Sequence, residues 1–160
     1  DSSVKVCEQI IKICVHHQDW TALNDHVSLL CRRHAQLKKT ITFVVRESIK
    51  LLDSIADEKT QLTFIDTIRS VSAGKIYVEL DRARLTKRLA DKQEKKGELK
   101  AACKTLMELQ VETIGSMELK EKAQLLVEQL RLNMATKDWV RAEITKRKIN
   151  TKKLNDSEEL

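Results

Sequence analysis

Proline is absent from this 160-residue sequence, and glycine occurs at only three positions, Gly74, Gly97 and Gly115. Proline interrupts helix interiors and glycine weakens them, whereas strand-rich folds rely on both residues for tight turns. Aromatic residues make up only 3% of the chain, so the core must be built mainly from Leu, Ile, Val and Ala. These scarcities predict an all-α fold.

Long apolar runs are also missing, and none approaches the roughly 20 residues that a membrane-spanning helix needs. The first residues, DSSVKVCEQI, lack the basic segment and apolar stretch of a signal peptide. Because the chain does not begin with Met, we expect it to be a fragment or a processed product. We expect no membrane partner.

None of the four cysteines forms a CxxC pair. Each falls on an apolar position of a helical pattern, where a free cysteine acts as a small hydrophobe. Free cysteines are typical of a reducing compartment, which favours the cytoplasm and the nucleus.

The sequence offers little that could support catalysis. Histidines and three of the cysteines share the first 34 residues, but their spacing fits no compact zinc motif. A cysteine nucleophile would need an exposed thiolate beside a base, and no residue stands out for that role. Glycine-rich phosphate loops and GxSxG motifs are absent. We therefore expect no enzymatic activity, no cofactor and no metal. The four histidines are His16, His17, His26 and His34.

Apolar residues recur at helical spacing almost throughout the chain. This periodicity predicts about eight helices joined by short turns over residues 1–154, followed by a polar tail at 155–160. Gly74 and Gly97 are expected to end helices, and Ser116 to cap the helix that follows it.

A weak repeat of about 40 residues underlies these helices. The first anchors of alternate helices are Trp20, Gln61, Leu99 and Trp139, at spacings of 41, 38 and 40 residues. Such a period with two helices per unit indicates a right-handed α-solenoid of stacked antiparallel helix pairs, similar to TPR or HEAT arrays. A compact bundle of similar helices is the alternative.

Two of these anchors follow an aspartate, Asp19 and Asp138, which can cap the helix N-terminus. We predict that Trp20, Leu99 and Trp139 are structural anchors and that the tryptophans wedge between helices of adjacent repeats.

The net charge is +6, with 30 basic and 24 acidic residues. One basic segment, at residues 82–100, is interleaved with acids and is typical of a solvated helix. A second is offset only by Glu143 and is a candidate contact surface for an acidic protein face or for nucleic acid. It lacks aromatic residues for base stacking, which disfavours nucleic acid. This basic patch comprises Arg141, Lys146, Arg147, Lys148, Lys152 and Lys153.

The last third of the chain carries a family resemblance. Its features are Val111-Glu112-Thr113 with Gly115-Ser116-Met117, Glu128-Gln129 with Arg131-Leu132, Lys137-Asp138-Trp139 with Arg141, and Lys148-Ile149-Asn150. With these features the chain resembles the 26S proteasome non-ATPase regulatory subunit 12 family, the PCI-type subunits of the regulatory-particle lid. The earlier helices are compatible with that family in length and order.

The resemblance implies a helical-repeat arm that precedes a PCI module, with the module itself absent from this chain. It implies a non-catalytic scaffold role in ubiquitin-dependent protein degradation, in the cytoplasm and nucleus. The implied partners are other lid subunits, with ATPase-ring and core-particle subunits as further candidates. The arm of a paralogous COP9 signalosome subunit and a basic helical module that binds nucleic acid are the alternatives.

Overall fold

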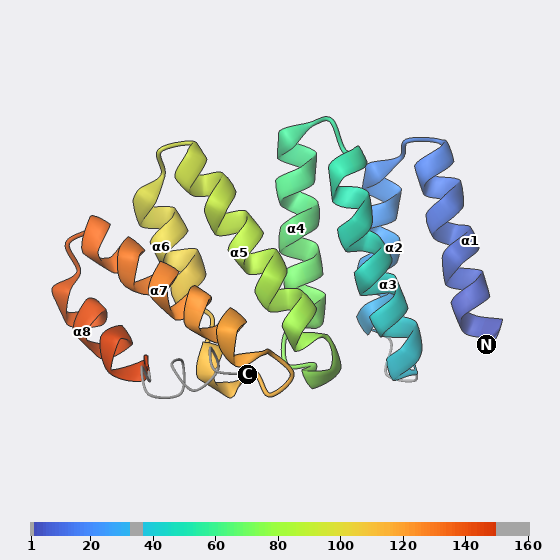
Figure 1. Cartoon of the computed structure of the whole chain (residues 1–160). Helices are drawn as coiled ribbons and strands as arrows, with labels where there is room; N and C mark the ends of the chain where they lie inside the picture. Colours follow the sequence, from blue (N-terminus) through green and yellow to red (C-terminus); the bar gives the residue numbers. More distant parts are fainter. Residues whose placement is uncertain (1, 33–36, 150–160) are drawn as a thin grey trace. The chain divides into compact units, whose positions relative to one another are not determined.

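A computed structural model describes residues 2–32 and 37–149, and within these ranges the regular structure is entirely helical (Figure 1). The all-α prediction is therefore confirmed for the described part of the chain, and so is the expected number of about eight helices. The α-helices are α1 (Ser2–His16), α2 (Trp20–Arg32), α3 (Lys38–Leu51), α4 (Glu58–Ser72), α5 (Glu79–Lys95), α6 (Leu99–Met107), α7 (Leu119–Ala135) and α8 (Trp139–Lys148). Short 3-10 helices are η1 (Leu52–Ser54), η2 (Ile76–Val78) and η3 (Val111–Thr113).

The chain divides into two compact units, residues 1–85 and residues 86–160, with the boundary inside α5. In the first unit, α1 packs against α2 and α3, and α4 packs against α2 and α3. In the second unit, α7 packs against α6, α8 and η3. These helices thus bury one face against neighbours of their own unit, which supplies most of the stability of a packed helix.

Aliphatic side chains fill both cores. The first unit also buries Phe64, which is 2% exposed and is among the largest fully buried side chains. The completely buried residues of this unit include Leu23, Val27, Val44, Val45, Leu52, Ile65, Ile68 and Val78. In the second unit the buried apolar residues include Ala102, Leu106, Val111, Leu125 and Leu132.

Three of the turns between helices share one geometry. Gln18, Gly97 and Lys137 all have positive φ angles, of 52°, 82° and 61°. In each turn the next amide donates to the carbonyl five residues earlier: Asp19 to Cys14 at 2.9 Å, and Asp138 to Asn133 at 2.8 Å.

The third turn repeats the bond, since the Glu98 amide donates to the Gln93 carbonyl at 2.9 Å. In each turn the amide of the positive-φ residue also donates to the carbonyl three residues earlier. The two hydrogen bonds together form the Schellman arrangement that closes a helix C-terminus. Gly97 fills this position as predicted, whereas Gln18 and Lys137 adopt a left-handed backbone that the sequence did not reveal.

The aspartate caps are confirmed. Oδ1 of Asp19 accepts a hydrogen bond from the Ala22 amide at 2.9 Å, and Oδ1 of Asp138 accepts one from the Arg141 amide at 3.1 Å. The backbone amide of each aspartate closes the C-terminus of one helix, and its side chain caps the N-terminus of the next. The same residue therefore serves both helix ends in a short turn. The Ser116 cap is wrong, because α7 begins at Leu119 and has Glu118 at its cap position without a side-chain bond.

The prediction that Trp139 is a buried anchor is wrong, because its side chain is 63% exposed. Leu99 is 37% exposed and Trp20 is half-buried. All three are the first residues of their helices, and helical side chains tilt toward the N-terminus, so these side chains project past the helix end. The buried position of the repeat lies three residues later, at Leu23, Phe64, Ala102 and Ala142.

Candidate protein-interaction surfaces

The cysteines are unsuited to catalysis. All four are free and buried, as predicted from their apolar positions. Burial raises the pKa of the Cys31 thiol to about 11, and burial likewise raises the pKa values of Cys7 and Cys14. A nucleophilic cysteine needs the opposite shift and access to solvent. These thiols therefore serve as core side chains.

Metal binding finds no support in the described part of the chain. Over residues 2–32 and 37–149, no three His, Cys, Asp or Glu side chains come together in a way that could hold an ion. His34 lies outside those ranges, whereas His16 and His17 are exposed and pack edge to face with ring centroids 5.2 Å apart. None of the described helices combines the length and the apolar character needed to cross a membrane.

The basic patch of α8 is largely neutralised by acidic side chains. Glu143 pairs with Arg147 at 3.2 Å and with Lys146 at 3.6 Å. The hydrogen bond from Arg147 and the charge of Lys146 hold the pKa of the Glu143 carboxyl below its usual value. Arg141 pairs with Asp138 at 3.5 Å.

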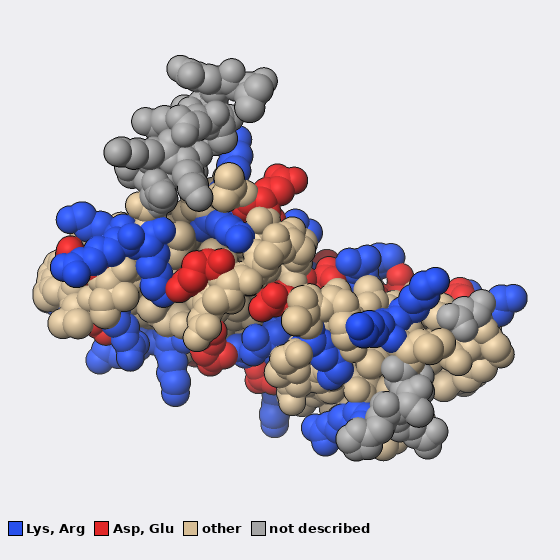
Figure 2. All heavy atoms as spheres, turned by 90° about the horizontal axis from the view of Figure 1, so that it is seen from below, with Lys and Arg blue, Asp and Glu red and all other residues tan. Residues whose placement is uncertain are grey.

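The fourth described cation of the patch, Lys148, pairs with Glu112 of η3 at 2.7 Å. This partner is remote in sequence, so the expectation that only Glu143 offsets the patch is wrong. Lys152 and Lys153 lie outside the described residues. On the face shown in Figure 2, basic and acidic side chains are likewise interspersed. The mixed charges of the described part of the patch do not favour nucleic-acid binding there.

Buried polar side chains organise the second unit, and the sequence pattern missed them. Asn133 of α7 is completely buried and accepts a hydrogen bond from the Cys103 thiol of α6 at 3.2 Å. Its amide donates to Oγ1 of Thr145 in α8 at 3.3 Å and approaches the Met107 sulfur at 3.4 Å. One side chain thus links three helices.

Gln129 completes this polar core. Its amide nitrogen donates to the carbonyls of Leu106 at 2.9 Å and Leu109 at 3.0 Å. The Leu109 carbonyl follows the end of α6, and the Leu106 carbonyl, in the last turn of α6, also accepts a bond from the Leu109 amide at 3.2 Å. In the first unit, Gln61 donates in the same way to the Leu52 carbonyl. The polar Gln61, which departs from the apolar repeat, is therefore a buried cap of a preceding helix end.

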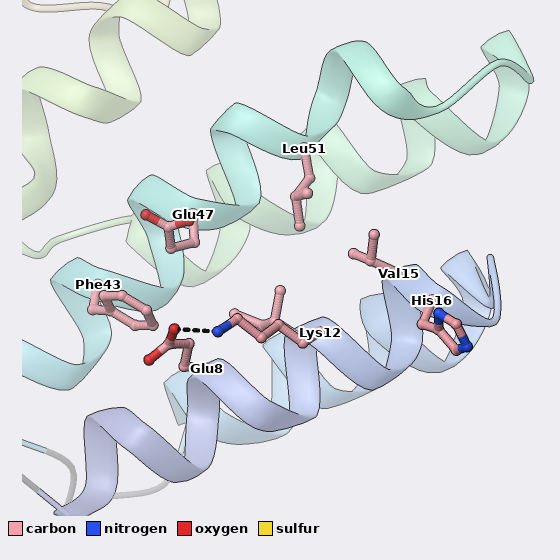
Figure 3. A pocket seen from close by; sticks show the side chains of 8 residues that line it. Glu8, Lys12, Val15, His16, Phe43, Glu47 and Leu51 are labelled. Atoms are coloured by element: carbon pink, nitrogen blue, oxygen red, sulfur yellow. Dashed lines mark ion pairs between the residues drawn. The ribbon is translucent and has the colours of Figure 1, made fainter.

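Grooves open between helices in both units, and two of them are lined by charged side chains. In the first unit a groove of about 460 Å³ lies between α1 and α3 (Figure 3). In the second unit a groove of about 490 Å³ lies between α5 and α7, lined by Lys87, Lys120, Ala123, Gln124, Val127 and Glu128. Neither groove was visible in the sequence, because each requires side chains from helices that are distant along the chain.

Comparison with known proteins gives a consistent result. The model of the family described as "PSMD12/CSN4, N-terminal" matches residues 1–160. The 26S proteasome non-ATPase regulatory subunit 12 of Dictyostelium discoideum is 41% identical over 157 residues, covering 98% of this chain and 35% of the relative. In Arabidopsis thaliana, homolog A of that subunit is 40% identical over 146 residues, covering 91% of this chain and 33% of the relative.

The 26S proteasome regulatory subunit RPN5 of Saccharomyces cerevisiae is 38% identical over 150 residues, covering 92% of this chain and 34% of the relative. The chain thus spans about a third of the length of the curated relatives that it matches.

Proposed function

Since the chain belongs to the PSMD12/CSN4 N-terminal family, we propose that it is the helical arm of a proteasome lid subunit and serves as a non-catalytic scaffold. The observation that carries this proposal is the family match over the full 160 residues, together with relatives near 40% identity that are named as 26S proteasome regulatory subunits. The buried, weakly acidic thiols agree with a role in binding rather than catalysis.

The arm would act as an α-solenoid of stacked helix pairs over residues 1–154, with a polar tail after it. Three turns with the same Schellman closure support a repeated two-helix unit. Contacts of α1 with α3 and of α2 with α4 support stacking of successive pairs in the first unit. Stacked pairs expose ridges and grooves along a continuous surface, which is how such arrays bind partners.

The proposed partners are other lid subunits, with ATPase-ring and core-particle subunits as further candidates, in the cytoplasm and the nucleus. In this scheme the arm binds neighbouring subunits during assembly and so contributes to ubiquitin-dependent degradation without any turnover of its own. A PCI module in the remainder of a longer protein would supply additional assembly contacts.

The experiment is affinity capture from cell extract with the chain as bait, at moderate salt, followed by quantitative mass spectrometry. We expect enrichment of proteasome regulatory subunits over a bait unfolded by a core substitution such as Phe64→Asp. Equal recovery with the two baits would contradict the proposal, because specific capture requires the folded surface.

The COP9 signalosome is the second candidate, because the family that matches the chain is named for both PSMD12 and CSN4. Enrichment of signalosome subunits in place of proteasome subunits would favour it. A nucleic-acid partner is not favoured, since each described cation of the α8 patch has an acidic partner. Binding of a DNA or RNA duplex that weakens steeply with salt would revive that alternative.

A further inference from the structure

The groove between α1 and α3 has an apolar floor and charged walls. Ile11 is buried beneath it, whereas Val15, Phe43 and Leu51 are half-buried and open toward it. In Figure 3, Phe43 lies near Glu8 at one end of the groove, and Leu51 faces Val15 toward the other. The complete lining is Glu8, Ile11, Lys12, Val15, His16, Phe43, Glu47 and Leu51.

This lining is acidic in a chain that is basic as a whole. It holds the carboxylates of Glu8 and Glu47 against the single ammonium group of Lys12, while the net charge of the chain is +6. Both carboxylates are paired with lysines of their own helix, Glu8 with Lys12 and Glu47 with Lys50, each at 2.6 Å.

In both pairs the lysine is the more exposed member. The Lys12 side chain is 62% exposed against 41% for Glu8, and the Lys50 side chain is 70% exposed against 33% for Glu47. Exposed pairs of this spacing contribute little to stability, so they exchange readily for other cations. The carboxylates are therefore available to a cationic partner that brings apolar groups to the floor.

The groove between α5 and α7 has the opposite balance. Lys87 and Lys120 face a single carboxylate, Glu128, beside the half-exposed Val127. The acidic lining therefore distinguishes the α1–α3 groove from the α5–α7 groove. The second groove also provides a matched control within the same protein.

We propose that the α1–α3 groove binds an amphipathic helix of a partner protein, with apolar residues against Val15, Phe43 and Leu51 and a Lys or Arg beside Glu8 and Glu47. This rests on the proposed scaffold function and deepens it by assigning a surface and the chemistry of its partner. A helix fits better than an extended peptide, because its backbone amides are bonded internally and two helical walls offer no strand edge to pair with them.

The test uses two synthetic peptides of about 20 residues, long enough to form a helix. Both carry Leu at positions i, i+4 and i+7, and they differ only in having Arg or Glu flanking that stripe. Binding to the full chain is measured by fluorescence anisotropy and mapped by amide chemical shifts. We expect the Arg peptide to bind with a Kd about threefold to fivefold lower, as two surface charge pairs predict, and shifts to concentrate in α1 and α3.

The double variant Glu8→Arg/Glu47→Arg should reverse this preference. The control variant Lys87→Glu/Lys120→Glu, in the α5–α7 groove, should leave it unchanged. Circular dichroism checks that both variants fold, which their partly exposed positions favour. Equal affinity for the two peptides, an unreversed preference in the folded double variant, or shifts outside α1 and α3 would overturn the proposal.

The result is separable from the scaffold assignment. If extract capture recovers proteasome subunits but the peptides show no charge preference, the scaffold stands and the groove proposal falls. If the peptide preference holds and reverses as expected while no regulatory subunit is captured, the groove binds a helix but the assignment to the proteasome fails.

Discussion

Residues 1–85 and residues 86–160 accommodate polar groups in their cores differently. In the first unit, Ser48 is completely buried and its hydroxyl has no hydrogen-bond partner among the described residues. In the second unit, Asn133 is equally buried but bonds to side chains of α6 and α8. Buried polar side chains of the first core such as Gln61 bond a backbone carbonyl, whereas in the second core Asn133 joins side chains of different helices.

The difference matters because the two kinds of core respond differently to substitution. Apolar packing loses stability in proportion to the volume removed, while a buried polar network loses it when a partner is left unpaired. Each unit contains one of the two tryptophans, Trp20 and Trp139, so fluorescence of Trp139→Phe and Trp20→Phe backgrounds reports on the units separately.

The largest effect is expected from Phe64→Ala in the first unit. Phe64 is 2% exposed, and its removal should lower the free energy of unfolding by about 3–5 kcal/mol. Guanidinium titration followed through Trp20 measures this loss. The matched control is Trp139→Ala, which should cost no more than about 0.5 kcal/mol by circular dichroism because the side chain is 63% exposed. A larger loss for Trp139→Ala than for Phe64→Ala would refute the burial described above.

The second-largest effect is expected from a substitution in the polar network of the second unit. Asn133→Leu keeps the volume but leaves Thr145 and the Cys103 thiol without this partner, so we expect a loss of about 1–3 kcal/mol. The readout is a denaturant titration followed through Trp139. In the first unit, Ser48→Ala should be neutral within about 0.5 kcal/mol, since no bond is lost. Similar losses for the two variants would erase the proposed distinction between the cores.

The Schellman turn occurs in both units, so substitutions at its positive-φ residue allow a comparison between them, with smaller expected changes in stability. A non-glycine residue in the left-handed region costs about 1–2 kcal/mol, so Gln18→Gly and Lys137→Gly should each raise stability by about 1 kcal/mol. Gly97→Ala should lower it by a similar amount through backbone strain alone, because a Cβ added there meets nothing within 4 Å. Thermal melts of the three variants check these signs. A stabilised Gly97→Ala variant would contradict the turn geometry.

The smallest effect concerns a surface ion pair of the second unit. Arg131 donates to both oxygens of Glu94, at 2.7 and 2.6 Å, and this hydrogen bonding lowers the pKa of the Glu94 carboxyl. A carboxyl with a lowered folded pKa adds stability above its unfolded pKa and loses that contribution as the pH falls through the folded value.

Arg131→Ala should therefore cost at most about 1 kcal/mol at neutral pH, and the cost should shrink below about pH 4. Denaturant titrations at several pH values measure the difference between the parent and the variant. A difference that is constant with pH would show that Arg131 acts through packing rather than through its charge.

Local chemistry explains what the sequence predicted well. The aspartate caps at Asp19 and Asp138 and the stop at Gly97 depend on residues within one turn, and all three are confirmed. The apolar period likewise predicted the helices themselves. The repeat of about 40 residues located the helix starts at Trp20, Leu99 and Trp139, but these first anchors are more exposed than the apolar positions three residues later.

What the sequence did not predict depends on contacts between helices. Asn133 looks like an ordinary surface residue until α6 and α8 surround it, and Lys148 appears unpaired until η3 brings Glu112 to it. The acidic α1–α3 groove combines residues of two helices, so the sequence pattern of either helix alone does not predict the groove.

The most direct test of the scaffold assignment is whether the chain associates with proteasome regulatory particles in cells. An epitope-tagged chain is expressed, and gently prepared extract is separated on a native gel that is probed for the tag and for proteasome subunits. We predict that part of the tagged chain comigrates with regulatory-particle species and that Phe64→Asp abolishes this comigration. A folded chain found only at its free position, while the regulatory particles in the same lane remain intact, would contradict the assignment.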